Sequence, residues 1–293
     1  MICGTARGIG KFPVAKCPPM DVYYIPEQKT FTSKVPDMKK MLVLLAGQSN
    51  MSGRGYLTEN DMTEIPGITA LRRDMVWIPA ADPFNYDRLG TLGLSNAADP
   101  FEVKGLEFNG NRRCGVGPGR TFAIALKELY PGNEIGLIPV SIGGTGINSW
   151  LPGGKDKHSD MHPYDDAVKM AREAMKEGEL VAVLWHQGET DAKNNTPDYK
   201  ELLKTVIANF RNDLGIEKVP FILGGLGDFL DPQWDVPRYN NIIREVASEM
   251  PHCGFVSAGG LNHRGDNLHF DTPSQYILGN RYFQEFCRLN KII

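Results

Sequence analysis

The sequence has little cysteine, no excess of basic residues and no long hydrophobic run. Its 293 residues include five cysteines, an odd and scattered set that argues against a disulfide framework and against paired metal ligands. Lys and Arg number 32 against 35 Asp and Glu, far from the cationic excess of a nucleic-acid binder. The longest apolar runs span about six residues, whereas a membrane-spanning helix needs roughly 20. We therefore expect no nucleic-acid partner, no membrane span and no metal site.

The first 38 residues differ in composition from the rest of the chain. They are rich in Pro, Gly and Lys and lack sustained hydrophobic periodicity, so we interpret residues 1–38 as an N-terminal extension whose role stays open. Their first 20 residues lack the apolar core of a signal peptide. A cytoplasmic location is therefore the default expectation, and secretion stays open.

From Lys40 onward, short apolar runs alternate with segments of helical period. We expect the runs to form strands buried on both faces, at Met41–Ala46, Ile135–Val140, Leu180–Trp185, Val219–Leu223 and Gly254–Ser257. Apolar residues at helical spacing predict helices near 122–129, 164–171, 199–210, 239–250 and 283–287. The alternation predicts one three-layer α/β/α sandwich with a central, mainly parallel sheet. Asp82–Gly119 breaks the rhythm, and we interpret it as a loop at the rim of a pocket.

Small and polar residues follow each predicted strand, where ligands bind in open parallel sheets. Gly47-Gln48-Ser49-Asn50-Met51 follows the first run, and Ser141-Ile142-Gly143-Gly144-Thr145-Gly146 the second. His186-Gln187-Gly188-Glu189-Thr190-Asp191 follows the third, and Asp266-Asn267-Leu268-His269 lies in the loop after the last. We expect these segments to meet at one edge of the sheet.

This set of residues suits acyl transfer through a serine nucleophile. A serine hydroxyl needs a base to take its proton, and the base needs a partner that fixes its tautomer. Asp266 and His269 are three residues apart, so one turn of chain can join the carboxylate to the imidazole while its other nitrogen faces Ser49. The Gly143 and Gly144 amides and the Gln187 carboxamide are candidate donors to the oxyanion.

These blocks resemble those of the SGNH hydrolases. Within that superfamily they are most similar to the acetylxylan esterases of carbohydrate esterase family 6 and to the sialate O-acetylesterase-like domains. The resemblance implies a flavodoxin-like SGNH hydrolase fold for residues 39–293, with no cofactor. It implies Ser49 as nucleophile, His269 as base and Asp266 as orienting acid. The implied oxyanion hole consists of the Ser49 N–H, a Gly143 or Gly144 N–H, and Gln187. The wider superfamily has Asn where this chain has Gln187.

Four further residues are assigned to substrate binding: Gln48, Thr145, Trp150 and Glu189. Trp150 follows the Gly143–Gly146 turn closely enough to stack on a sugar ring, although packing beneath the loop is an equal alternative. Gln187 has an alternative role as a partner of buried backbone groups. Glu189 and Asp191 lie on one short loop, which favours a role in holding that loop over a glycosidase carboxylate pair.

We therefore expect a serine esterase that removes short acyl groups, chiefly acetyl, from a carbohydrate. Two alternatives stay open. One is a lipase-like or thioesterase-like SGNH enzyme acting on longer acyl chains, and the other is a carbohydrate-binding protein that keeps the fold without turnover. The sugar, the ester position and the oligomeric state are left undetermined by the sequence.

Overall fold

A computed structural model describes residues 40–85, 115–157 and 161–292. The chain divides into two compact units, Met1–Pro36 and Asp37–Ile293, and every described residue belongs to the second. Two predicted features, the extension of residues 1–38 and most of the loop Asp82–Gly119, lie outside the described residues and stay predictions.

A seven-stranded sheet forms the centre of the described unit, in the order β3-β2-β4-β1-β5-β6-β7. Neighbouring strands are parallel, except for the antiparallel pair β2 and β3 at one edge. The strands are β1 Lys40–Gly47, β2 Ile68–Leu71, β3 Trp77–Pro79, β4 Glu134–Pro139, β5 Glu179–His186, β6 Phe221–Gly224 and β7 Cys253–Val256. Five of them coincide with the predicted apolar runs.

Strand β1 lies between β4 and β5 in the middle of the sheet and is buried on both faces, because a hydrophobic core covers each face. Its alternate residues fill two separate cores, Met41, Val43 and Leu45 on one side and Leu42, Leu44 and Ala46 on the other. Side chains alternate across a strand, so a strand with a core on each face has no polar positions. This is the physical reason for its unbroken apolar run.

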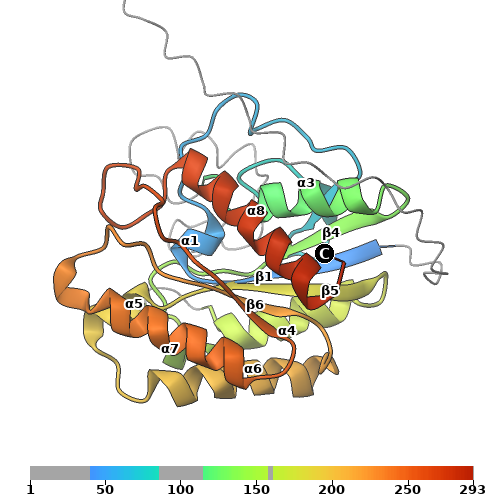
Figure 1. Cartoon of the computed structure of the whole chain (residues 1–293). Helices are drawn as coiled ribbons and strands as arrows, with labels where there is room; N and C mark the ends of the chain where they lie inside the picture. Colours follow the sequence, from blue (N-terminus) through green and yellow to red (C-terminus); the bar gives the residue numbers. More distant parts are fainter. Residues whose placement is uncertain (1–39, 86–114, 158–160, 293) are drawn as a thin grey trace, which may run out of the picture. The chain divides into compact units, whose positions relative to one another are not determined.

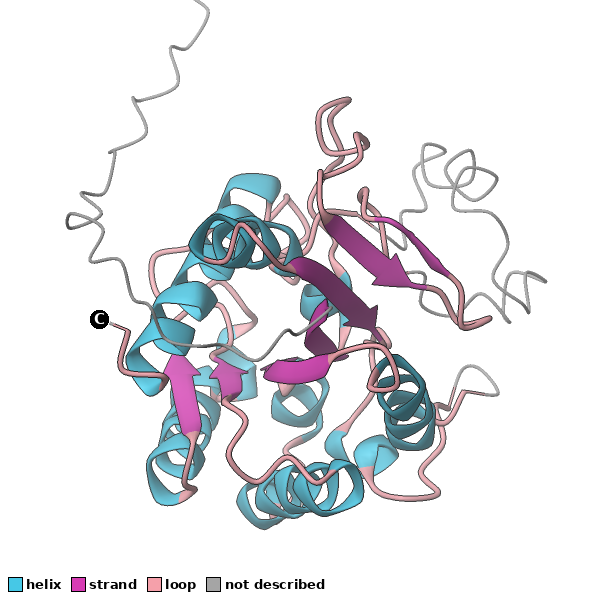
Figure 2. Cartoon of the chain, turned by 90° about the vertical axis from the view of Figure 1, so that its right-hand side faces the viewer, coloured by secondary structure: helices cyan, strands magenta, loops and turns pink. Residues whose placement is uncertain are grey.

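Helices cover both faces of the sheet. Figure 1 shows α3 and α8 above it and α4, α6 and α7 below it, and Figure 2 shows the same layers from the side. The helices are α1 Ser49–Ser52, α3 Gly119–Leu129, α4 Pro163–Ala174, α5 Glu189–Asn194, α6 Tyr199–Leu214, α7 Val236–Glu249 and α8 Thr272–Leu289, with 3-10 turns at Ile147–Trp150 and Pro232–Trp234. The predicted three-layer α/β/α sandwich is confirmed.

The edge hairpin is the part of the sheet that the sequence did not indicate. Strands β2 and β3 have four and three residues, too few to display a reliable alternation of apolar and polar positions. Strand β3 is partly exposed, and its Trp77 ring centre lies 3.8 Å from the Lys40 ammonium. A short strand ending in such a contact leaves little edge for another chain to pair with.

The strand order places a topological switch at β1. Strand β4 lies on one side of β1 and β5 on the other. The chain therefore runs from β1 toward the β2 and β4 side, and the later connection from β4 to β5 crosses to the opposite side. Loops after the strands diverge at such a point, and open α/β sheets bind ligands there, beyond the carboxyl ends of the strands. The segments that follow β1, β4 and β5 are therefore the place for a functional site.

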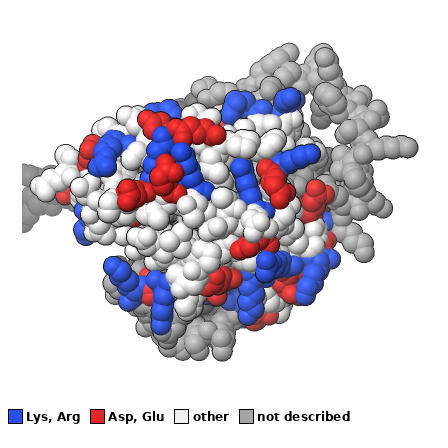
Figure 3. Space-filling view, turned by 90° about the horizontal axis from the view of Figure 1, so that it is seen from below, with Lys and Arg blue, Asp and Glu red and all other residues white. Residues whose placement is uncertain are grey.

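Acidic and basic side chains lie side by side on the surface seen from below (Figure 3). Lys200 of α6, for example, lies 2.9 Å from Glu245 and 2.7 Å from Glu249 of α7. Water screens exposed pairs of this kind, so they add little to the contact between two helices that are held together by their buried faces. No helix in the described ranges has both the length and the apolar character needed to cross a bilayer.

Candidate active site

Ser49 lies directly beyond the central strand, as the first residue of helix α1. The strand ends at Gly47, which has a φ of +130° and lies so close to β5 that a Cβ would come within 2.1 Å of the His186 carbonyl oxygen. Only glycine fits such a position. The backbone therefore turns without leaving β5, and Ser49 is held, 6% exposed, at the carboxyl end of the sheet.

Asp266 and His269 lie on a tight loop between β7 and α8, which we call the His263–Phe270 loop. An antiparallel bridge between His263 and Phe270 closes it, and the Arg264 N–H donates to the His269 carbonyl at 2.9 Å. Within the loop, Asp266 Oδ1 accepts the His269 N–H at 2.8 Å. This backbone bond holds the carboxylate beneath the imidazole, as the three-residue spacing predicted.

Hydrogen bonds join Ser49, His269 and Asp266 into a continuous triad. His269 Nε2 lies 3.0 Å from Ser49 Oγ, across 220 positions of sequence, and His269 Nδ1 lies 2.7 Å from Asp266 Oδ2. A carboxylate only accepts hydrogen bonds, so Nδ1 carries the hydrogen and Nε2 offers its lone pair to the serine hydroxyl. The arrangement can therefore deprotonate Ser49 as its oxygen attacks an electrophile.

The surroundings keep Asp266 ionised and His269 neutral. Burial alone would raise the pKa of Asp266, but hydrogen bonds from His269 and Arg264 outweigh it and hold that pKa well below its usual range. Burial lowers the pKa of His269, and the positive charges of Arg54 and Arg264 act in the same direction against the effect of Asp266. A neutral imidazole beside a charged carboxylate is the state that a general base requires.

Asn50, the residue after Ser49, ties helix α1 to the loop that carries His269. Its Oδ1 accepts the Phe270 N–H at 3.1 Å, and its Nδ2 donates to the Leu268 carbonyl at 3.2 Å. The same Nδ2 donates to Glu189 Oε1 at 2.5 Å, and His186 Nε2 lies 3.4 Å from that oxygen. These contacts hold helix α1, which carries Ser49, at a fixed distance from the loop that carries His269.

The structure places Gln187, the predicted oxyanion donor, in the protein interior. Gln187 is fully buried, and its Nε2 donates to Asp191 Oδ2 and, at 3.1 Å, to the Thr145 carbonyl. An amide nitrogen has two hydrogens, and both are taken up inside the protein. The alternative role, as a partner of buried backbone groups, is the one that the geometry supports.

The four residues assigned to substrate binding are also buried. Trp150 is 0% exposed and packs edge-on against Trp185 with ring centres 4.9 Å apart, while its Nε1 donates to Thr145 Oγ1 at 3.1 Å. Thr145 and Glu189 are each 1% exposed, and Gln48 is 2% exposed with Oε1 3.5 Å from the Gly188 N–H. Their side chains bond to neighbouring loops, and their contact with substrate stays a prediction.

The predicted backbone donors lie at the turn after β4. Gly143 is buried, whereas Gly144 is exposed and has a φ of +74°, a conformation that favours glycine. Asp191 Oδ2 accepts the Ile147 N–H at 2.9 Å and so anchors the segment that follows this turn. Asp191 therefore holds the loop, as the sequence favoured.

Two residues next to the triad were missed by sequence reasoning, Asn50 and Arg264. Arg264 Nε donates to Asp266 Oδ2 at 2.7 Å, and its Nη1 donates to the Arg54 carbonyl at 2.9 Å. The available signal was an arginine two positions before the orienting aspartate. For Asn50 the signal was an amide beside the nucleophile, able to both donate and accept.

Comparison with known proteins agrees with this fold and geometry. Residues 39–288 match the family model for carbohydrate esterase, sialic acid-specific acetylesterase. The chain is 30% identical over 272 residues to the probable carbohydrate esterase At4g34215 of Arabidopsis thaliana, covering 86% of this chain and 94% of that protein. The solved structure of the Arabidopsis protein has a TM-score of 0.66 at 28% identity, covering 86% of this chain and 98% of that one. The structure of NanS, 17% identical, has a TM-score of 0.65 and covers 88% and 100%, which shows a shared fold.

This α/β/α sandwich has its polar residues at the carboxyl edge of the sheet, where open parallel sheets bind ligands. The family model covers most of the chain, and the chain belongs to the carbohydrate esterase, sialic acid-specific acetylesterase family. It is a carboxylic ester hydrolase, and the family resemblance read from the sequence blocks is confirmed.

Proposed function

We propose that this chain removes acetyl groups from hydroxyls of a carbohydrate, with Ser49 as nucleophile, His269 as general base and Asp266 as the residue that orients it. The observation that carries the proposal is the pair of hydrogen bonds at 3.0 and 2.7 Å that joins these three side chains. Membership of a carbohydrate acetylesterase family supports the choice of substrate class.

Acyl transfer begins when Ser49 Oγ attacks the ester carbonyl carbon while His269 Nε2 takes the hydroxyl proton. The tetrahedral intermediate then collapses, the bond to the sugar oxygen breaks, and His269 returns the proton to that oxygen. Water next attacks the acyl-enzyme and gives a proton to His269. Acetate leaves, and Ser49 regains its hydrogen.

The negative charge of the intermediate needs donors that do not move during the reaction. The Ser49 N–H lies in the first turn of α1, where backbone N–H groups have no carbonyl partner within the helix. A Gly143 or Gly144 N–H at the neighbouring strand end is the second predicted donor. With Gln187 engaged in the interior, the oxyanion hole consists of backbone groups in this proposal.

The test is acetate release by the purified chain from acetylated xylan, acetylated sialic acid and simple peracetylated sugars. Ser49→Ala is expected to lower kcat/KM by about 10⁴-fold or more. Ser52→Ala is the matched control, because this buried serine lies on the same helix and its hydroxyl bonds to the Ser141 carbonyl at 3.1 Å, away from His269. We expect Ser52→Ala to stay within about tenfold of the wild type.

Three results would overturn the proposal. Equal activity of Ser49→Ala and the wild type would exclude Ser49 as nucleophile. A strong preference for octanoyl over acetyl p-nitrophenyl esters would instead favour an enzyme of longer acyl chains. Saturable sugar binding by a chain that fails to react with a serine-directed phosphonate would favour a binding protein.

A further inference from the structure

Two arginines anchor the chain segment between β7 and α8, and they do so in different ways. Arg281 of α8 donates from Nη1 to the Ser257 carbonyl at 2.7 Å and to the Gly259 carbonyl at 3.1 Å. Arg264 donates from Nη1 to the Arg54 carbonyl at 2.9 Å, and its Nε reaches a side chain of the triad. Both arginines therefore anchor the backbone, but only Arg264 also contacts the triad.

Arg264 and His269 share one oxygen of Asp266. Both His269 Nδ1 and Arg264 Nε lie 2.7 Å from Oδ2, while Oδ1 accepts the Leu268 and His269 N–H groups at 3.0 and 2.8 Å. Four donors thus surround the carboxylate, and the guanidinium brings a permanent positive charge. Charge-assisted hydrogen bonds of this kind are about twice as strong as neutral ones.

We propose that Arg264 is a positioning residue of the esterase triad, which holds Asp266 in place and, by sharing its Oδ2 oxygen, sets the pH range over which His269 is a base. The inference rests on the function proposed above. It goes beyond that function by assigning a fourth side chain to the triad. Arg264 acts through Asp266 and does not itself contact the reacting atoms.

The effect on His269 follows from the charges that face it. Among the described residues, Asp266 favours the charged imidazolium, whereas Arg54 and Arg264 disfavour it. A carboxylate that also neutralises a guanidinium stabilises an imidazolium less than a carboxylate that faces the imidazole alone. Removing the Arg264 charge should therefore let His269 take up a proton at higher pH.

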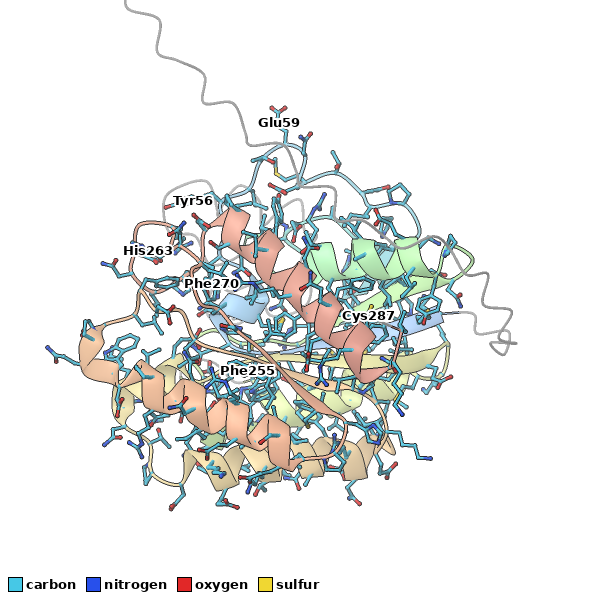
Figure 4. The ribbon with its side chains drawn as sticks, in the orientation of Figure 1. Tyr56, Glu59, Phe255, His263, Phe270 and Cys287 are labelled. Carbon is cyan, nitrogen blue, oxygen red and sulfur yellow. The ribbon has the colours of Figure 1, made fainter. Side chains whose placement is uncertain are left out.

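The effect on position follows from the fork shape of the guanidinium. One arm holds Asp266, and the other holds the Arg54 carbonyl, which lies shortly after helix α1. The guanidinium carbon is also 5.7 Å from the centre of the Tyr56 ring, and Figure 4 shows Tyr56 and His263 at the same end of the unit. Lysine, a point charge on a flexible stem, keeps the charge but not both hydrogen bonds.

The experiment titrates the His269 imidazole by heteronuclear NMR in the full chain, with His269→Gln used to assign its signal. It also records kcat/KM against pH for an acetyl ester. Arg264→Met removes the charge and the fork, Arg264→Lys removes only the fork, and Arg281→Met is the matched loss of a backbone anchor. Because the NMR titration needs no turnover, it tests the proposal even where ester hydrolysis fails.

We expect Arg264→Met to raise the midpoint of the His269 titration, and the acid limb of kcat/KM, by about 0.4–1 pH unit. Arg264→Lys should keep the midpoint near that of the wild type and lower kcat. Arg281→Met should leave the midpoint unchanged. Equal midpoints in Arg264→Met and the wild type would overturn the proposal, and so would an equal shift in Arg281→Met. If neither the wild type nor Ser49→Ala hydrolyses the acetyl ester, this result would instead count against the proposed function.

Discussion

Two aspartates near the carboxyl edge of the sheet have pKa values that are shifted in opposite directions, although both carboxylates accept several hydrogen bonds. The pKa of Asp266 is lowered, because donors that include His269 and the Arg264 guanidinium outweigh its burial. The pKa of Asp191 is raised, because burial outweighs neutral donors such as the Gln187 amide and the Ile147 N–H. Asp266 is the more exposed of the two, and its donors include a backbone N–H, the imidazole and a guanidinium, so only in its case do the donors outweigh the loss of water.

The surroundings of Asp266 suit a residue that takes part in the proposed chemistry, and those of Asp191 suit a residue that holds the structure together. The Asp266 side chain is 32% exposed and lies on a surface loop, whereas Asp191 is 1% exposed and joins the segments after β4 and β5. A carboxylate that must stay ionised beside a base fits the first setting. A carboxylate that closes a buried network fits the second.

Asp266→Asn should produce the largest effect, a fall in kcat of about 10⁴-fold. An asparagine amide facing His269 would donate where the carboxylate accepted, so the imidazole would be held in the wrong tautomer. Its oxygen can still accept the backbone N–H groups that Oδ1 receives, whereas the Arg264 guanidinium loses its charged acceptor, so we expect a folded variant with a lowered free energy of unfolding. Ester hydrolysis and urea unfolding, measured on one preparation, check both expectations. A variant with more than a tenth of the wild-type activity would remove Asp266 from the mechanism.

Gln187→Met should have the opposite profile. The substitution keeps the volume but removes one donor from each of two buried acceptors, the Thr145 carbonyl and Asp191 Oδ2, of which the second keeps the Ile147 N–H. We expect a loss of about 2–3 kcal/mol in the free energy of unfolding and a kcat within about tenfold of the wild type.

Urea unfolding and kcat at a temperature where the variant stays folded provide the check for Gln187→Met. Asp266→Asn is its control, since it should stay folded and be inactive. A drop in kcat of about 10²–10³-fold without destabilisation would restore Gln187 as an oxyanion donor.

Most of the fold was predictable because buried strands carry a continuous signal. The apolar run of β1 and the helical spacing in α6 reflect faces that are covered completely. Strands β2 and β3 have only four and three residues, and the edge strand β3 is partly exposed, so their sequences carry no comparable pattern. The sequence therefore predicts the centre of the sheet better than its edge.

The candidate site was predictable in its positions but not in its side-chain directions. The ends of the strands and the Asp266-x-x-His269 spacing predicted which segments meet. Trp150 points into the core because the 3-10 turn Ile147–Trp150 rotates it inward, and no pattern of single residues encodes that rotation. The sequence did not indicate the role of Arg264, because Arg264 and Asp266 come together only when the His263–Phe270 loop is closed.

The pH dependence of the wild type tests the charged side of the comparison. His269 acts as a base only when neutral, and its pKa is lowered, so kcat/KM should fall on the acid side with a midpoint below about 6.5. Below that midpoint the rate should drop about tenfold per pH unit. Steady-state rates between about pH 4 and 8 in buffers of constant ionic strength provide the check. A midpoint above 7 would mean that the Asp266 charge dominates over burial and the two arginines.

Asp191→Asn tests the buried side, where the smallest effect is expected. The raised pKa of Asp191 means that the folded state binds its proton more tightly than the unfolded chain does. The stability that this proton contributes is present below the unfolded pKa, near 3.9, and is lost as pH rises through the folded value. Asparagine keeps an acceptor oxygen without the charge, so the stability of the variant relative to the wild type should improve from pH 4 to pH 7. Urea unfolding at the two pH values measures this difference. An opposite trend would show that the buried amide donors stabilise the carboxylate as well as the guanidinium does at Asp266.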